Sequence, residues 1–121
     1  MPHLHLEYSE NLPALEVDTL LLRLNHALVA TGQFANESDI KSRAVKAQAF
    51  RVGTAPGNRG FAHIKLALLS GRSPEVKKLV SESLLAVLTE AAPWPAGLNI
   101  QLCVEILDID RESYAKARID G

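Results

Sequence analysis

Residues 61–91 read FAHIKLALLSGRSPEVKKLVSESLLAVLTEA, and they join a strand pattern to a helix pattern. Over residues 61–69 apolar side chains alternate with period two, which predicts a half-buried strand. Ser73 is a typical N-cap, and Pro74 suits the first position of a helix. Small and apolar residues then recur at the i, i+3, i+4, i+7 spacing of an amphipathic helix: Val76, Leu79, Val80, Ser83, Leu84, Val87, Leu88 and Ala91.

Two more strands and a helix are expected before this stretch. Residues 2–8 alternate, with Leu4, Leu6 and Tyr8 on the face of Pro2 and the two histidines and Glu7 on the other. A helix is expected from Pro13, in its first turn, to a stop at Gly32. Leucines recur along it at near-helical spacing: Leu15, Leu20, Leu21, Leu24 and Leu28. Residues 42–52 are expected to form a strand, and residues 54–60 a turn rich in Gly and Pro.

A final strand is expected at 99–109, followed by a polar tail at 110–121. The order strand, helix, strand, strand, helix, strand makes two β-α-β units, and a helical crossover implies parallel pairing within each. We therefore expect a single α+β domain over residues 1–121, with α/β-type crossovers. It should have a four-stranded sheet with two helices on one face. Nothing in the chain remains to cover the other face, which predicts an oligomer built on that face.

The composition excludes several classes of protein. The chain has 121 residues, 47% of them hydrophobic, and a formal net charge of −1, so it offers no general attraction for nucleic acid or anionic membranes. No apolar run reaches the ~18 residues of a membrane span, and the N-terminus lacks a signal-peptide pattern. The single cysteine, Cys103, cannot form an internal disulfide, which fits a reducing compartment. We expect a soluble cytoplasmic protein.

Pro2, directly after Met1, is a candidate acid/base group. A small second residue favours removal of the initiator methionine, which would leave proline with a free secondary amine. An ordinary α-amino group titrates near pH ~8, and an apolar pocket or nearby cations lower that value. An amine poised near neutral pH can accept a proton and return it. A retained Met1 would block this chemistry, and a proline after methionine often has no function.

Three cations are candidate binding groups for an anionic substrate. Arg72 precedes the Ser73-Pro74 helix start, where a guanidinium and free backbone N–H groups suit a carboxylate. The local sequence alone favours a solvated loop arginine at this position over a binding residue. Lys41 and Arg43 stand two apart at the start of a strand and so point to the same face. Arg43 is also compatible with a surface ion pair.

The histidines and Cys103 carry weaker signals. His63 lies in a strand, where histidine is more often structural than catalytic. His3 and His5 share a strand face, but only Glu7 on that strand is a further candidate ligand, so we expect no metal site. Cys103 lies in an apolar strand and is expected in the core rather than as a nucleophile.

Six short stretches between residue 1 and about residue 75 are informative together: Met1-Pro2-His3, Ser9-Glu10-Asn11, Ala30-Thr31-Gly32, Ile40-Lys41-Ser42-Arg43, Phe61-Ala62-His63 and Gly71-Arg72-Ser73. In their order and nearly in their spacing they resemble the 5-carboxymethyl-2-hydroxymuconate δ-isomerase family of the tautomerase superfamily. The second helix and last strand fit the family in pattern rather than in identities.

This resemblance implies a trimer of tautomerase-fold subunits and a cofactor-free isomerase. Pro2 would move a proton along a conjugated dicarboxylate dienol to give the unsaturated keto acid, in the bacterial breakdown of aromatic acids such as homoprotocatechuate. Lys41, Arg43, Arg72 and His63 would bind the substrate. The family's catalytic arginine aligns with Lys41, which keeps the charge but lacks the planar fork of arginine. This departure leaves the substrate and the rate open.

Two alternatives therefore stand beside the isomerase. One is another enzyme of the superfamily, such as a phenylpyruvate-type tautomerase or a decarboxylase of a small keto acid. The other is a trimeric binding protein that has the fold but no turnover, which a retained Met1 would favour.

Overall fold

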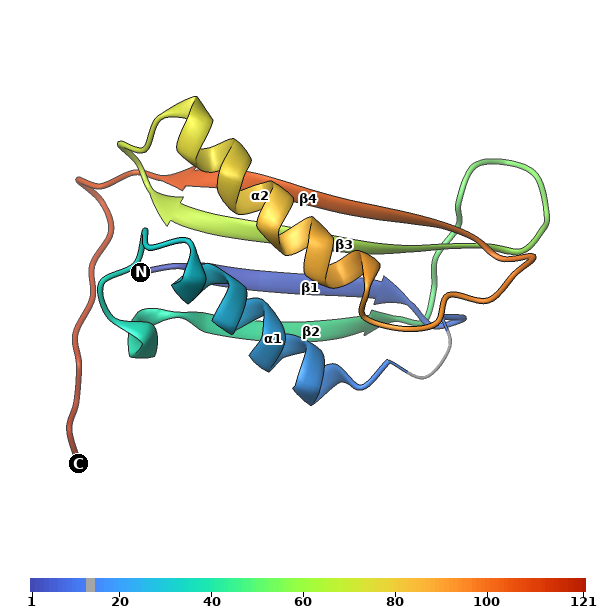
Figure 1. Ribbon diagram of the computed structural model, residues 1–121, viewed down its shortest axis with the longest axis horizontal. Coiled ribbons are helices and arrows are strands. Elements are labelled where there is room, and N and C mark those ends of the chain that lie inside the picture. The colour runs from blue at the N-terminus through green and yellow to red at the C-terminus, as the bar shows by residue number, and fades with distance from the viewer. Residues whose placement is uncertain (13–14) are drawn as a thin grey trace.

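The computed structural model describes residues 1–12 and 15–121, and it contains a four-stranded sheet with two helices across one face (Figure 1). The strands are β1 (His3–Ser9), β2 (Lys41–Ala47), β3 (Arg59–Leu69) and β4 (Asn99–Ile109). The helices are α1 (Val17–Ala30) and α2 (Pro74–Thr89), and a short 3-10 helix, η1 (Glu37–Asp39), precedes β2. No described helix combines the length and the apolar character that a membrane span requires.

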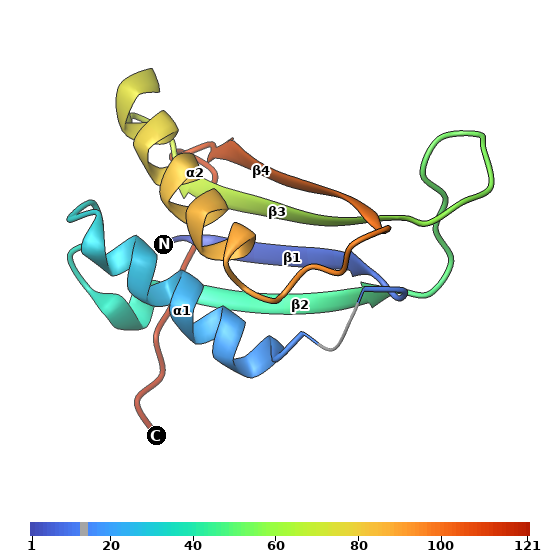
Figure 2. The ribbon, with the colours of Figure 1, turned by 45° about the vertical axis from the view of Figure 1, so that its right-hand side comes forward.

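The strand order is β2-β1-β3-β4. The pairs β1·β2 and β3·β4 are parallel, as expected for strands joined through a helix, while β1 and β3 pair antiparallel. The predicted pair of β-α-β units on one four-stranded sheet is confirmed. A view turned by 45° shows that both helices lie on the same side of the sheet (Figure 2).

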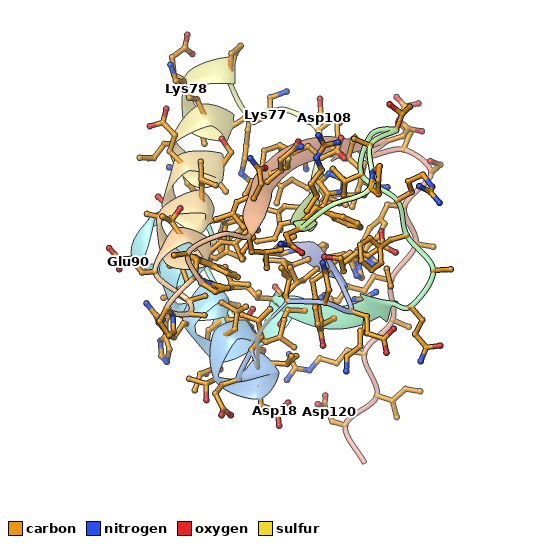
Figure 3. All side chains as sticks on the ribbon, turned by 90° about the vertical axis from the view of Figure 1, so that its right-hand side faces the viewer. Asp18, Lys77, Lys78, Glu90, Asp108 and Asp120 are labelled. Carbon is orange, nitrogen blue, oxygen red and sulfur yellow. The ribbon has the colours of Figure 1, made fainter. Side chains whose placement is uncertain are left out.

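The core lies between the sheet and the helices. The alternating residues Leu4 and Leu6 of β1 are buried, as the period-two pattern predicts. The sheet also contributes Ala62, Ile64, Leu66 and Leu68, and the helices contribute Leu20, Leu24, Leu28, Val80, Leu84 and Leu88. At the sheet edge, Nζ of Lys77 on α2 lies 3.3 Å from Oδ2 of Asp108 on β4 (Figure 3).

The element boundaries match the sequence pattern best where a cap or glycine fixes them. Ser73 caps α2 by accepting a hydrogen bond from the backbone N–H of Val76. Gly32, at φ 73°, follows the last turn of α1 in the left-handed conformation. Glu16 precedes α1 without a side-chain cap bond, and Pro13, expected in the first turn, falls outside the described residues.

The strand predicted at 42–52 is wrong in its second half, since β2 ends at Ala47. Among the strands that the structure describes, β2 pairs with β1 alone, and β1 ends at Ser9 opposite Ala47. The chain turns at Glu10, whose N–H donates to the carbonyl of Ala47, so the residues after Ala47 have no described strand beside them to pair with.

Cys103, expected in the core, is instead exposed. Strand β4 is the sheet edge, and its odd-numbered residues face away from the helices.

We call the side of the sheet opposite the helices the open face. Two large apolar residues lie exposed on it, Val45 (58%) and Leu107 (43%). A hollow of about 420 Å³ lies over its middle, lined by His5, Leu6, Glu7, Arg43, Val45, His63, Lys65, Ala67 and Leu107.

Candidate active site at the N-terminal end of the sheet

One end of the sheet gathers segments that are far apart in sequence. Strands β1 and β2 both begin there, with His3 opposite Lys41. Strand β3 runs the other way, so its last residues and the Arg72 loop reach the same end. The tail after β4 also passes this end beside the N-terminus (Figure 1). We call this region the Pro2 end.

Pro2 itself is fully buried, with less than 2% of its surface exposed. It extends the buried face of Leu4 and Leu6, as the alternation predicts. Its carbonyl accepts a hydrogen bond from the backbone N–H of Lys41 at 3.1 Å, which ties the residue to the start of β2. The nitrogen of residue 2 is thus held in a fixed place by the packing of both parallel strands.

The α-amino group is carried by Met1 in this structure, and its pKa is lowered from 8.0. Burial is the largest cause, because it disfavours the charged form. Asp39 opposes the change, while Lys41, Lys116 and Arg72 add to it. The N-terminal end of β1 is therefore a place where the neutral form of an amine is favoured more than it is in water.

Lys41 and Arg43 follow one another along β2 but have different neighbours. The pKa of Lys41 is lowered, first by burial and then by Lys116 and Arg43, against an opposing effect of Asp39. Arg43 instead donates to Nδ1 of His3 at 3.1 Å and approaches Nε2 of His5 at 3.5 Å. Among the residues described, no three His, Cys, Asp or Glu side chains are grouped to hold a metal ion.

Arg72 is held by the backbone and by an aromatic ring. Its Nη2 donates to the carbonyl of Gln33 at 3.0 Å, and its Nη1 lies 3.5 Å from the carbonyl of Leu69. The guanidinium lies 4.9 Å from the ring centroid of Phe34, at a distance typical of a cation–π contact. These contacts fix Arg72 directly before α2, close enough to lower the pKa of the N-terminal amine.

His63 lies away from the Pro2 end. It stands opposite Glu7 in the β1·β3 pairing, five residues along the strand from Pro2, or about 17 Å at the usual rise. Its Nε2 forms an ion pair with Oε1 of Glu105 at 2.7 Å on the open face. Within this chain the structure brings Lys41 and Arg72 to the amine but not His63.

The sequence pattern missed the part of the site that comes from η1 and the tail. Lys116 Nζ donates to Oδ1 of Asp39 at 2.7 Å and to Sδ of Met1 at 3.1 Å. Tyr114 Oη lies 2.9 Å from Nε2 of His3. The only signal available in advance was a tyrosine and a lysine two apart in an otherwise weakly patterned tail.

The arrangement has the parts that a proton transfer on an anionic substrate needs. A buried amine can act as base and then as acid when its pKa lies near the working pH. Lysine and arginine side chains beside it can bind carboxylates through charge-assisted hydrogen bonds.

The chain matches a family model described as 5-carboxymethyl-2-hydroxymuconate isomerase over residues 2–120. In structure it is similar to a 5-carboxymethyl-2-hydroxymuconate isomerase from Deinococcus radiodurans R1, with 32% identity over 98% of this chain and 90% of that one, and a TM-score of 0.88. A 5-carboxymethyl-2-hydroxymuconate delta-isomerase matches at 21% identity, covering 99% and 89% of the two chains, with a TM-score of 0.77.

More distant similarity extends to a fused 4-OT protein described as a symmetric trimer. It shares 17% identity over 95% of this chain and 91% of that one, with a TM-score of 0.69, which shows a common fold. No curated protein is significantly similar in sequence. The family model and the 32% identical relative agree with the resemblance seen in the sequence. The chain is an isomerase with the tautomerase fold, and it belongs to the 5-carboxymethyl-2-hydroxymuconate isomerase family.

Proposed function

We propose that the protein, once Met1 is removed, isomerises 5-carboxymethyl-2-hydroxymuconate or a close analogue, with Pro2 as the acid/base group and no cofactor. The observation that carries this proposal is the burial of residue 2 at an end of the sheet where the pKa of the N-terminal amine is lowered. The family match supplies the substrate class.

In the proposed reaction the Pro2 nitrogen takes the proton of the 2-hydroxyl group. The C–O bond becomes a carbonyl, the two double bonds of the dienol become one between C3 and C4, and the ammonium returns its proton to C5. The product is an unsaturated keto acid of the same composition. Lys41 and Arg72 bind carboxylates and hold the chain of the dienol against the amine.

The substrate in the family's name has three carboxylates, one more than the dicarboxylate expected in the sequence analysis. Muconate has a carboxylate at each end, and the carboxymethyl group adds a third. A site for this molecule needs several cations in a small space. The Pro2 end has Lys41, Arg72 and Lys116 within electrostatic reach of the amine.

We also propose a homotrimer in which the open face of each subunit packs against its neighbours. Apolar surface is exposed to water on this face of a single subunit. It includes Val45 and Leu107, which also line the hollow together with His5 and His63. The trimeric 4-OT protein of the same fold supports this assembly. The physiological setting we infer is the degradation of aromatic acids such as homoprotocatechuate in the cytoplasm.

A second candidate rests on Lys41, which stands where the family's arginine is expected. A point charge in place of a planar fork suits a smaller enol or keto acid, as in a phenylpyruvate-type tautomerase. Lys41→Arg separates the two. If the protein is an isomerase of this family, the substitution should keep or raise kcat/KM for the carboxymethyl substrate. If the protein prefers a smaller acid, the substitution should lower kcat/KM for that acid.

The test is an ultraviolet absorbance assay on protein whose mass shows that Met1 is absent. Loss of the dienol band of 5-carboxymethyl-2-hydroxymuconate, much faster than with phenylpyruvate enol, would support the proposal. Faster turnover of the smaller enol would favour the second candidate, and turnover of neither would favour the binding protein.

A further inference from the structure

Lys116, in the tail after β4, meets the opposite end of the chain. Its Nζ donates to Oδ1 of Asp39 at 2.7 Å and to Sδ of Met1 at 3.1 Å. Its side chain is only 32% exposed, and that of Asp39 is 27% exposed. A lysine this confined in an irregular segment is held by its partners and not by regular secondary structure.

Two other contacts fix the tail at this place. Tyr114 Oη lies 2.9 Å from Nε2 of His3, and Nε of Arg111 donates to the carbonyl of Ser70 at 2.8 Å. Lys116 therefore follows a segment that is already tied to β1 and to the end of β3. Its approach to Met1 does not depend on a single hydrogen bond.

The side chain of Met1 occupies space that its removal would open beside Pro2. A lysine ammonium has three donors, and here one is used by Asp39 and another is directed at the Met1 sulfur. Without Met1 this second donor faces the space next to the proline amine. Lys116 also lowers the pKa of the N-terminal amine, as expected for a cation at close range.

We propose that Lys116 is a substrate-binding residue that holds the third carboxylate of the substrate, and that Asp39 is the residue that positions it. The inference rests on the proposed function and deepens it. Lys41 and Arg72 provide cations for two carboxylates, while Arg43 is engaged by His3 and His5 and Arg111 by the carbonyl of Ser70. Asp39 keeps the flexible lysine at the site through a bond that the substrate need not break.

The experiment compares 5-carboxymethyl-2-hydroxymuconate with 2-hydroxymuconate, which lacks only the carboxymethyl arm. In Lys116→Ala we expect KM for the first substrate to rise about 10- to 100-fold, the worth of one charge-assisted hydrogen bond, with kcat changed less than about threefold. KM for 2-hydroxymuconate should change less than about threefold. Lys116→Arg keeps the charge, so it should restore KM for 5-carboxymethyl-2-hydroxymuconate most of the way to the wild-type value.

Arg118→Ala is the matched control, because it removes a cation from the same tail. Arg118 pairs with Asp120 and is 59% exposed, so its loss should leave both KM values unchanged. Equal rises of KM for both substrates in Lys116→Ala would show a loss of tail structure or of general charge, and would overturn the inference. An unchanged KM for the carboxymethyl substrate would overturn it as well.

Calorimetry keeps this test separate from the proposed function. Muconate and 3-carboxymuconate differ by one carboxylate and contain no enol to isomerise. Wild type should bind the tricarboxylate more tightly, and Lys116→Ala should lose about 10-fold or more of that preference. If wild type turns over neither hydroxymuconate, the proposed function fails, while the calorimetric preference still decides the role of Lys116. An equal preference in wild type and Lys116→Ala would exclude Lys116 as a carboxylate-binding residue.

Discussion

Tyr114 Oη lies 2.9 Å from Nε2 of His3, so the tail of the chain is bound to its first strand. Arg43, which can only donate, approaches the other ring nitrogen at 3.1 Å. Nδ1 of a neutral His3 is therefore the acceptor, and Nε2 carries the proton that it donates to Tyr114. One imidazole thus joins β1, β2 and the tail.

This relationship predicts a stability that depends on pH. Burial, followed by the charges of Lys41, Arg43, His5 and the N-terminal amine, lowers the pKa of His3 below 6.5. As the pH falls through 6.5 the unfolded chain takes up this proton first, so the folded state loses stability until folded His3 also becomes protonated. Relative to wild type, His3→Gln should gain stability between pH 7 and 5, measured by urea unfolding. A constant difference would contradict the assignment.

Removal of Met1 should activate the enzyme, because it frees the amine of Pro2. Protein starting at Pro2 should be active, and Pro2→Ala should lose about 10²- to 10⁴-fold in kcat, the usual worth of a positioned acid/base group. Variants with an extra residue before Pro2 should lose more, because the proline nitrogen is then an amide. Intact mass spectrometry and kcat on the same sample check this. Full turnover by protein with Met1 intact would exclude the proline mechanism.

The rate should rise with pH as the amine loses its proton. The site lowers the pKa of the N-terminal amine from 8.0 through burial and through Lys41, Lys116 and Arg72. The acid limb of kcat/KM for the processed protein should therefore lie at lower pH than the titration of an N-terminal proline exposed to water. Lys41→Met removes one of the cations, so it should move that limb to higher pH. A limb that stays in place would show that the titrating group is not the amine.

Arg72 should matter for both binding and stability. Arg72→Ala should raise KM about 10- to 100-fold for dicarboxylates and less for monocarboxylates. It should also lower Tm, because the hydrogen bonds to Gln33 and Leu69 and the contact with Phe34 are lost. Equal effects on both substrate classes, together with the lower Tm, would leave Arg72 a structural role only. Calorimetric melting and KM on the same variant separate the two.

The open face should hold the trimer together. Val45→Asp places a charge on this face and should give a monomer in analytical ultracentrifugation at micromolar concentration. Leu22→Asp is the matched control, because Leu22 on α1 is equally exposed, at 58%, but lies on the helix side. A wild-type monomer, or equal dissociation of both variants, would contradict the assembly.

The sequence alone determined the architecture, because periodicity and capping residues along the chain define its strands and helices. Alternation placed Leu4, Leu6 and Pro2 on one face, and helical spacing with Ser73 and Pro74 defined α2. The two crossovers through helices then required parallel pairs, as the sheet shows. The resemblance over the first 75 residues led to the family that the whole chain matches.

Only the tertiary structure decided which cations meet at the amine. Lys41 and Arg43 look alike in sequence, and strand register sets them opposite His3 and His5. Of the two, only Arg43 hydrogen-bonds to these histidines, while Lys41 stays beside the amine. His63 fits the family's pattern, yet the antiparallel β1·β3 pairing sets it far along the sheet from Pro2. Asp39 and Lys116 are 77 positions apart and meet because the tail folds back over the ends of three strands. Contacts of this kind follow from long-range pairing and have no periodicity that a sequence could display.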